Sequence, residues 1–200
     1  MKSNQSSICA GSRPSKTTIR KHLLGLVLCA VGVASANAQV MPGMRAPNDL
    51  VDAAVMAVNS ACMLASAGRP VPGINMPAGG NAGEGITERR SAPDWVKKVS
   101  ASQGRSRFST LASPEGEVWI RFDESTARCS VIVRRSDVEK FRSAFGDSFV
   151  KGSSELKREV AADGSELFLN EDAAFVWKTR VSSAATTSDV VLIETIFARK

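Results

Sequence analysis

The chain has 200 residues, with 26 Lys and Arg against 20 Asp and Glu, four cysteines, one histidine and no tyrosine. Five of the basic residues, two of the cysteines and the histidine, His22, lie within residues 1–38, which contain no acid. Without this leader the net charge falls from +6 to about +1, which is too little for the basic surface of a nucleic-acid-binding protein. The remainder also lacks an imidazole, which excludes Ser-His-Asp and Cys-His catalysis and histidine-bound zinc or haem.

The leader has the three parts of a secretory signal peptide. A basic start is followed by an apolar run from Leu23 to about Ala34, and then by the small residues Ala-Ser-Ala-Asn-Ala. Ala36 and Ala38 occupy the positions that a signal peptidase inspects, which predicts cleavage between Ala38 and Gln39. We therefore expect a protein that the general secretory route exports to the periplasm or out of the cell.

Two other interpretations of the leader stay open. A retained transmembrane helix needs about 20 apolar residues, and this apolar run is shorter and ends in small polar residues. A lipoprotein signal needs a small residue before the modified cysteine, whereas Leu28 precedes Cys29 in the middle of the run. We expect cleavage, which leaves the mature protein without a membrane span.

After the leader, residues 39–47 contain two prolines and a glycine and predict a flexible start. We expect residues 48–200 to form a single domain. Its first element is a helix that Asn48 or Asp49 can cap and that Gly68 ends. The helix face predicted to pack on the core consists of Val51, Val55, Val58, Cys62 and Ala65.

The next stretch, residues 69–91, is rich in glycine and proline and predicts a long surface loop without a P-loop pattern. A short helix is expected at 92–100. A second helix, capped by a box from Ser136 to Glu139, is expected to end at Gly146. Alternating polar and apolar residues predict strands at 108–112, 118–122, 128–134, 155–160, 166–170, 173–181 and 189–199.

These elements predict an α+β fold. Strands joined by short turns favour antiparallel pairing, and helices then cover a face of the sheet. We expect an antiparallel sheet of about six to seven strands with the N-terminal helix and one mid-chain helix packed on it, together with one disulfide. No internal repeat is visible in the sequence.

Cys62 and Cys129 are the two cysteines that follow the leader. Oxidising compartments favour disulfides, and two cysteines allow one intramolecular pairing. The sequence therefore predicts a Cys62–Cys129 disulfide, which would stabilise the fold by roughly 4 kcal/mol in the chain-entropy model. The absence of a C-x-x-C motif argues against a thioredoxin-like redox role.

Acidic pairs and one Ser-Lys spacing are the candidates for catalysis. Neighbouring acids occur at Asp123–Glu124 and Glu171–Asp172, and Ser154 precedes Lys157 by three residues. Paired carboxylates and Ser-Lys pairs both support hydrolysis. Neighbouring acids in turns are more often solvated, and the Ser-Lys spacing lacks a companion motif, so a histidine-free hydrolase is the alternative function and not the first.

Three tryptophans, Trp95, Trp119 and Trp177, are candidates for lining a ligand groove because an indole ring offers a large flat contact. Packing in the core is the competing interpretation. From the leader, the disulfide and the missing imidazole we expect an exported binding, inhibitor or envelope-accessory module without catalytic activity. Its partner would be a protein or a small ligand of the envelope, and we expect no cofactor, metal or nucleic acid.

The leader and the disulfide can be checked together on protein purified from the envelope or medium of an expressing bacterium. We expect an intact mass that corresponds to a chain starting at Gln39. A thiol-alkylating reagent should add no label to the folded protein before reduction, and two labels after reduction and unfolding. A chain that still begins at Met1, or two reactive thiols without reductant, would contradict this expectation.

Overall fold

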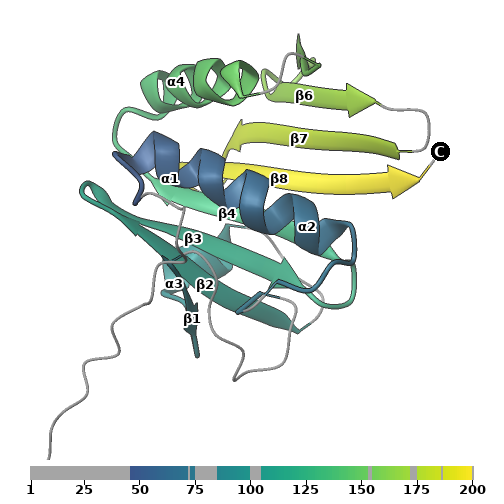
Figure 1. Ribbon diagram of the computed structural model, residues 1–200. Helices are drawn as coiled ribbons and strands as arrows, with labels where there is room; N and C mark the ends of the chain where they lie inside the picture. The colour runs from purple at the N-terminus through teal and green to yellow at the C-terminus, as the bar shows by residue number, and fades with distance from the viewer. Residues whose placement is uncertain are drawn as a thin grey trace, which may run out of the picture. The chain divides into compact units, whose positions relative to one another are not determined.

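The computed structural model describes residues 46–71, 73–74, 85–99, 105–152, 155–171, 175–185 and 187–199. In these residues one sheet of eight strands carries helices on its two faces (Figure 1). The predicted leader, its cleavage site at Ala38 and Gln39, and most of the predicted flexible start lie outside the described residues.

The eight strands run antiparallel in the order β1-β2-β3-β4-β8-β7-β6-β5. The α+β prediction is confirmed at this level, with one or two strands more than expected. Their bounds are β1 Ile86–Arg89, β2 Ser106–Ser113, β3 Gly116–Asp123, β4 Arg128–Arg134, β5 Lys157–Val160, β6 Glu166–Glu171, β7 Phe175–Ser183 and β8 Val190–Arg199.

The strand that the sequence did not predict is β1, which lies inside the segment assigned to a loop at 69–91. Its four residues pair with β2 from Ile86–Leu111 to Arg89–Phe108. Four residues are too few for an alternating pattern to stand out beside a glycine-rich segment. Pairing with β2 and burial of Ile86 in the core make this stretch a strand.

The first helical segment consists of α1 (Leu50–Met56), η1 (Ala57–Cys62) and α2 (Met63–Ser66), which follow one another without a break. Asp49 caps it, since its side chain accepts a hydrogen bond of 2.7 Å from the Asp52 amide. Gly68, at φ +73°, ends it as predicted. We call this segment the first helix.

The face that the first helix turns to the sheet differs from the predicted one. Val58, Cys62 and Ala65 are buried as expected, but Val51 and Val55 are only half-buried. The other buried positions are mostly alanines. Alanine lets a helix approach a sheet closely, but its side chain is too small to stand out when a sequence is searched for a face of large apolar residues. These buried positions are Leu50, Ala53, Ala54, Ala57 and Ala61.

The second long helix, α4 (Val138–Lys151), lies beside the first helix on the same face of the sheet (Figure 1). Its Phe145 and Phe149 are buried and meet the ring of Phe168 on β6 edge to face, with centroids 6.2 and 5.4 Å apart. This aromatic cluster fixes α4 over the second half of the sheet.

Two details predicted for α4 are wrong. Gly146 lies inside the helix and does not end it. A Cβ at this glycine would approach the guanidinium of Arg158 to 3.0 Å, so the missing side chain makes room for the ion pair between Arg158 and Glu166. The capping box is also absent, because the N-cap is Asp137, which forms no side-chain cap bond.

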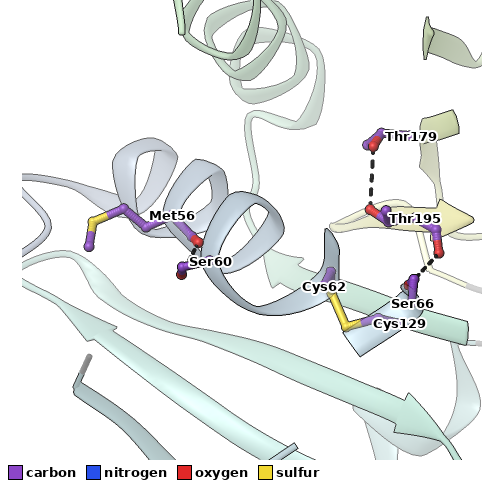
Figure 2. Close-up of a disulfide and its surroundings, with 7 residues drawn as sticks. All are labelled: Met56, Ser60, Cys62, Ser66, Cys129, Thr179 and Thr195. Carbon is purple, nitrogen blue, oxygen red and sulfur yellow. Dashed lines mark hydrogen bonds between the residues drawn. A yellow bond between two sulfur atoms is a disulfide. The ribbon is translucent and has the colours of Figure 1, made fainter. Parts of the chain in front are cut away.

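The disulfide joins the first helix to the sheet. Cys62 in η1 forms a disulfide with Cys129 in β4 (Figure 2). Their Cα atoms lie 5.0 Å apart. One turn later the hydroxyl of Ser66 donates to the Thr195 carbonyl of β8 at 3.3 Å. The disulfide predicted from the sequence is therefore present, and it ties the first helix to one of the two central strands of the sheet.

The order of elements repeats once along the chain. The first half consists of the first helix followed by β1, β2, β3 and β4, and the second half consists of α4 followed by β5, β6, β7 and β8. The strand order of the second half mirrors that of the first, and the halves meet where β4 pairs antiparallel with β8. This topology relates the halves by an approximate two-fold axis between β4 and β8.

The two halves connect their first and second strands differently. In the first half a short helix, α3 (Asp94–Lys98), lies between β1 and β2. It packs on the sheet face opposite the long helices, where Val96 and Val99 join Ile132 and Leu192 in a second apolar cluster. In the second half a tight turn at Asp163–Gly164 joins β5 directly to β6, as the sequence predicted.

Candidate functional site

A polar pocket of ≈ 330 Å³ opens in the second half, on the sheet face that carries α3. Its walls come from β7, β8, the turn between β5 and β6, and α4, with Val99 after α3 at one side. Four charged residues line it: Arg142, Asp163, Arg180 and Glu194.

Arg180 and Asp163 form one side of the pocket. The Arg180 guanidinium makes an ion pair with the Asp163 carboxylate and donates from Nε to the Ser165 hydroxyl at 3.0 Å. Asp163 also accepts from the Ser165 hydroxyl and amide at 2.6 and 3.1 Å. The hydroxyl bond is the largest cause that holds the pKa of Asp163 below its ordinary value of 3.8. Any stability from this lowered pKa is present above the unfolded value and is lost as the pH falls through the folded one.

Glu194 lies directly opposite Arg180 in the β7–β8 ladder. Cross-strand neighbours of opposite charge usually pair, but here the guanidinium turns to Asp163 instead. Among the described residues the Glu194 carboxylate has no hydrogen bond or ion pair. The pocket therefore contains a half-buried acceptor that has no donor among the described residues.

Arg142 reaches the pocket from α4. Its terminal nitrogens donate to Glu139 at 3.0 Å and to the Gly164 carbonyl at 2.6 Å. Its Nε is buried and has no acceptor in the described part of the chain. Buried polar atoms nearly always have partners, and an exception is a candidate for a functional role. Within the described residues, the pocket thus has one acceptor without a donor, at Glu194, and the unpartnered Nε of Arg142 lies buried behind its wall.

Next to the pocket, no described helix covers the same face of the sheet over β6, β7 and β8 (Figure 1). The residues on this open face are apolar except for one lysine, and Ile196 is 42% exposed. The residues that form this open face are Leu167, Leu169, Val176, Lys178 and Ile196.

The acids singled out from the sequence do not meet in a cleft. Asp123 is buried, and Arg121 donates to both of its oxygens at 3.0 Å. Glu124 and Glu171 are exposed, as is Lys157 on β5. The remaining members of these pairs, Asp172 and Ser154, lie outside the described residues.

The three tryptophans do not form one groove. Trp95 and Trp119 pack in the apolar cluster under α3, where the guanidinium of Arg134 lies 5.7 Å from the Trp95 ring. Trp177 projects from the opposite face of the sheet in the second half and packs on Phe197, with ring centroids 4.6 Å apart. None of the three lines the polar pocket.

The residues of the pocket were not predicted. No sequence pattern singled out Arg142, Arg180 or Glu194. The available signal was that Glu194 interrupts a strand that is otherwise uncharged near its middle, whereas Arg180 shares the middle of its strand with Lys178. This pattern points to a site only once Arg180 and Glu194 are known to be cross-strand neighbours.

Other kinds of site find no support in the part of the chain that the structure describes. No three His, Cys, Asp or Glu side chains gather there to hold a metal ion, and none of the helices there is long and apolar enough to cross a bilayer. Comparisons with protein-family models, curated proteins and solved structures find no match to the chain. The polar pocket is therefore the candidate functional site.

Substitution of Asp123 tests whether this buried acid stabilises the fold. We expect Asp123→Asn to lower the free energy of unfolding by about 3 kcal/mol, because it removes the negative charge that pairs with the buried guanidinium of Arg121. The matched control is Glu124→Gln at the exposed neighbouring position, which should change stability by less than about 0.5 kcal/mol. Urea unfolding measures both variants, and equal effects at the two positions would contradict a structural ion pair.

Proposed function

We propose that this protein is an exported, disulfide-stapled binding module without catalytic activity, and that its ligand site is the polar pocket of the second half. The single observation that carries the proposal is the Glu194 carboxylate, which lines this pocket and has no partner among the described residues. Glu194 accepts no hydrogen bond and the Nε of Arg142 donates none within the described residues. A ligand that donates to Glu194 would supply the hydrogen bond that this half-buried carboxylate lacks within the described residues.

The export part of the proposal is supported by two sequence features. The leader has the composition of a secretory signal. The two cysteines outside the leader form the disulfide, and disulfides persist mainly in oxidising compartments outside the cytosol. Within such a compartment the staple keeps the first helix on the sheet.

The geometry of the pocket favours binding over catalysis. Its carboxylate at Asp163 is held in an ion pair with Arg180 and bonded to Ser165, so it is not a free proton acceptor. Its guanidiniums carry hydrogen-bond donors and no acceptor atom, so neither serves as a general base. A hydrolase would need a second free carboxylate or an activated nucleophile beside Glu194. No observation specifically favours the histidine-free hydrolase.

The pocket is also held in shape before any ligand arrives. Arg180 and Glu194 stand on paired strands, and Arg142 is fixed by bonds to Glu139 and to the Gly164 carbonyl. Side chains that are positioned in advance bind with a smaller loss of conformational entropy. This is the property expected of a binding module.

Amide hydrogen exchange tests the proposal on the mature, oxidised protein. An envelope extract is divided by ultrafiltration into a small-molecule and a macromolecular fraction, and each is added to the protein. We expect one fraction to slow exchange in the turns between β5 and β6 and between β7 and β8. Arg180→Gln should abolish that protection.

The matched control is Arg89→Gln in the first half, since Arg89 also pairs with a strand carboxylate, Glu117, but lies outside the pocket. This variant should keep the protection. If neither fraction slows exchange in the two turns, or if Arg180→Gln responds like the unaltered protein, the pocket is not the ligand site.

A further inference from the structure

The neighbours of Glu194 in the sheet leave its carboxylate unpaired. Arg180 on β7 and Ser130 on β4 lie directly beside it in the two ladders that β8 forms. The guanidinium of Arg180 is turned to the Asp163 carboxylate, with which it makes an ion pair. No hydrogen bond joins Ser130 to Glu194 within the described residues. Glu194 is thus a half-buried acid whose cross-strand neighbours do not compensate its charge.

The next cations on this face of the sheet are not paired with Glu194 either. Arg121 on β3 is the cross-strand neighbour of Ser130 and therefore faces the same side as Glu194. Its guanidinium is held by both oxygens of Asp123 at 3.0 Å. Lys178 lies diagonally across from Glu194 on β7, and it is exposed and forms no ion pair in the part of the chain that the structure describes. A partner for Glu194 must therefore come from outside these residues.

The charges around the pocket leave one negative charge uncompensated. Two guanidiniums and two carboxylates line it. Arg180 pairs with Asp163, and Arg142 pairs with Glu139, which lies outside the lining. Both guanidiniums are therefore matched, and the unmatched charge is that of Glu194. A cation balances this charge, whereas a neutral ligand leaves it as it is and an anion adds to it.

The first half of the chain shows that the fold does not require a charge at this place. An axis through the Val131–Ile193 pair of the β4–β8 ladder relates Ile132 to Glu194, since each follows its axis residue along the strand. Ile132 is fully buried in the apolar cluster under α3. Burying a charged group destabilises a fold unless the group is paired. A role in binding therefore accounts for Glu194 better than a role in folding.

The wall of the pocket next to α3 is apolar. Val99, Ala184 and Leu192 line the pocket and belong to the second apolar cluster. Leu192 precedes Glu194 by two residues, so the two side chains lie on the same face of β8. An aliphatic group along this wall loses its contact with water while a charged group attached to it lies at the carboxylate.

We propose that the pocket binds a primary alkylammonium group, which donates to the Glu194 carboxylate and whose aliphatic part lies against Leu192 and Val99. The inference rests on the proposed function of the pocket and names the chemistry of its ligand. A primary ammonium carries three donors, and its hydrogen bond to a carboxylate is about twice as strong as a bond between neutral groups. Free aliphatic amines and the lysine side chains of a protein partner share this chemistry, and the test separates these two sources.

Arg180 shapes the pocket and does not bind the ammonium. Through Asp163 and Ser165 it holds the turn between β5 and β6 against β7, and this turn forms one wall of the pocket. Loss of Arg180 releases that wall. Arg180→Gln therefore tests the shape of the pocket, and Glu194→Gln tests its charge.

Four matched probes test the inference by titration at low salt, followed through the backbone amide NMR signals of the mature protein. The probes are n-butylammonium, n-butanol, which has a neutral donor, butyrate, which has the opposite charge, and tetramethylammonium, which has no N–H donor. We expect saturable shifts at the pocket residues with butylammonium. Its affinity should be at least about tenfold higher than that of the other three, since a lost charge-assisted hydrogen bond weakens binding by about that factor or more.

One variant and its matched control assign the contact. Glu194→Gln should weaken butylammonium binding about tenfold or more while leaving butanol binding unchanged. The control is Glu159→Gln on β5, since Glu159 is an exposed acid on the same face of the sheet but outside the pocket. This control should bind butylammonium like the unaltered protein. The four-probe comparison on the unaltered protein stands even if a variant fails to fold.

Competition with the envelope fractions identifies the source of the ammonium group. Excess butylammonium should remove the protection that an active fraction gives to the amides of the pocket turns. Removal of the protection given by the small-molecule fraction indicates a free amine. Removal of the protection given by the macromolecular fraction indicates a lysine side chain of a protein partner.

The inference is overturned if butylammonium gives no saturable shift, if another probe binds as tightly, or if Glu194→Gln binds butylammonium like the unaltered protein. These outcomes are distinguishable from failure of the proposed function. If an envelope fraction still slows exchange in the pocket turns, the pocket is a ligand site and only the ammonium class is wrong. If neither butylammonium nor any envelope fraction acts there, the binding function itself is wrong.

Discussion

The antiparallel pairing of β4 with β8 is the contact on which the remaining structure depends. It joins the two halves from the Cys129–Thr195 pair to the Arg134–Val190 pair. The side chains that it turns to the long helices, among them Val131 and Ile193, are fully buried. Because this ladder lies at the middle of the sheet, it places both helices on one face and leaves the short strands β1 and β5 at the edges. Cys129 lies at one end of this ladder and forms the disulfide that holds the first helix to the sheet.

The same topology explains why the pocket lies where it does. Each half presents a second sheet face away from the long helices, and α3 covers that face in the first half. The second half has a tight turn in place of α3, so Arg180 and Glu194 come together at the corresponding place without a helix of the described chain above them. Arg142 reaches the same place from α4. The pocket is thus a difference between two otherwise similar halves.

Local pattern was enough to predict most of the fold and little of the site. The alternation in Arg128–Arg134 and the Asp-Gly turn at 163–164 identify strands because the reason for each is local. The role of Gly146 could not be predicted, since the reason for that glycine is an arginine on a strand reached later in the chain. The pocket is non-local in the same sense: Arg142, Arg180 and Glu194 become neighbours only after β7 and β8 have paired and α4 has packed. The disulfide is the exception, because two cysteines allowed one pairing.

Native-state hydrogen exchange tests most directly whether the β4–β8 ladder holds two halves in one cooperative unit. We expect the amides of β3, β4, β7 and β8 to be the slowest in the oxidised protein and to exchange with one common free energy, which equals that of global unfolding. Mutation of the ladder at Ile193→Ala should lower this free energy equally in both halves, by about 2 kcal/mol or more. If β7 and α4 instead exchange with a clearly lower free energy while β3 and β4 remain protected, the halves unfold separately and the central role of the ladder is contradicted.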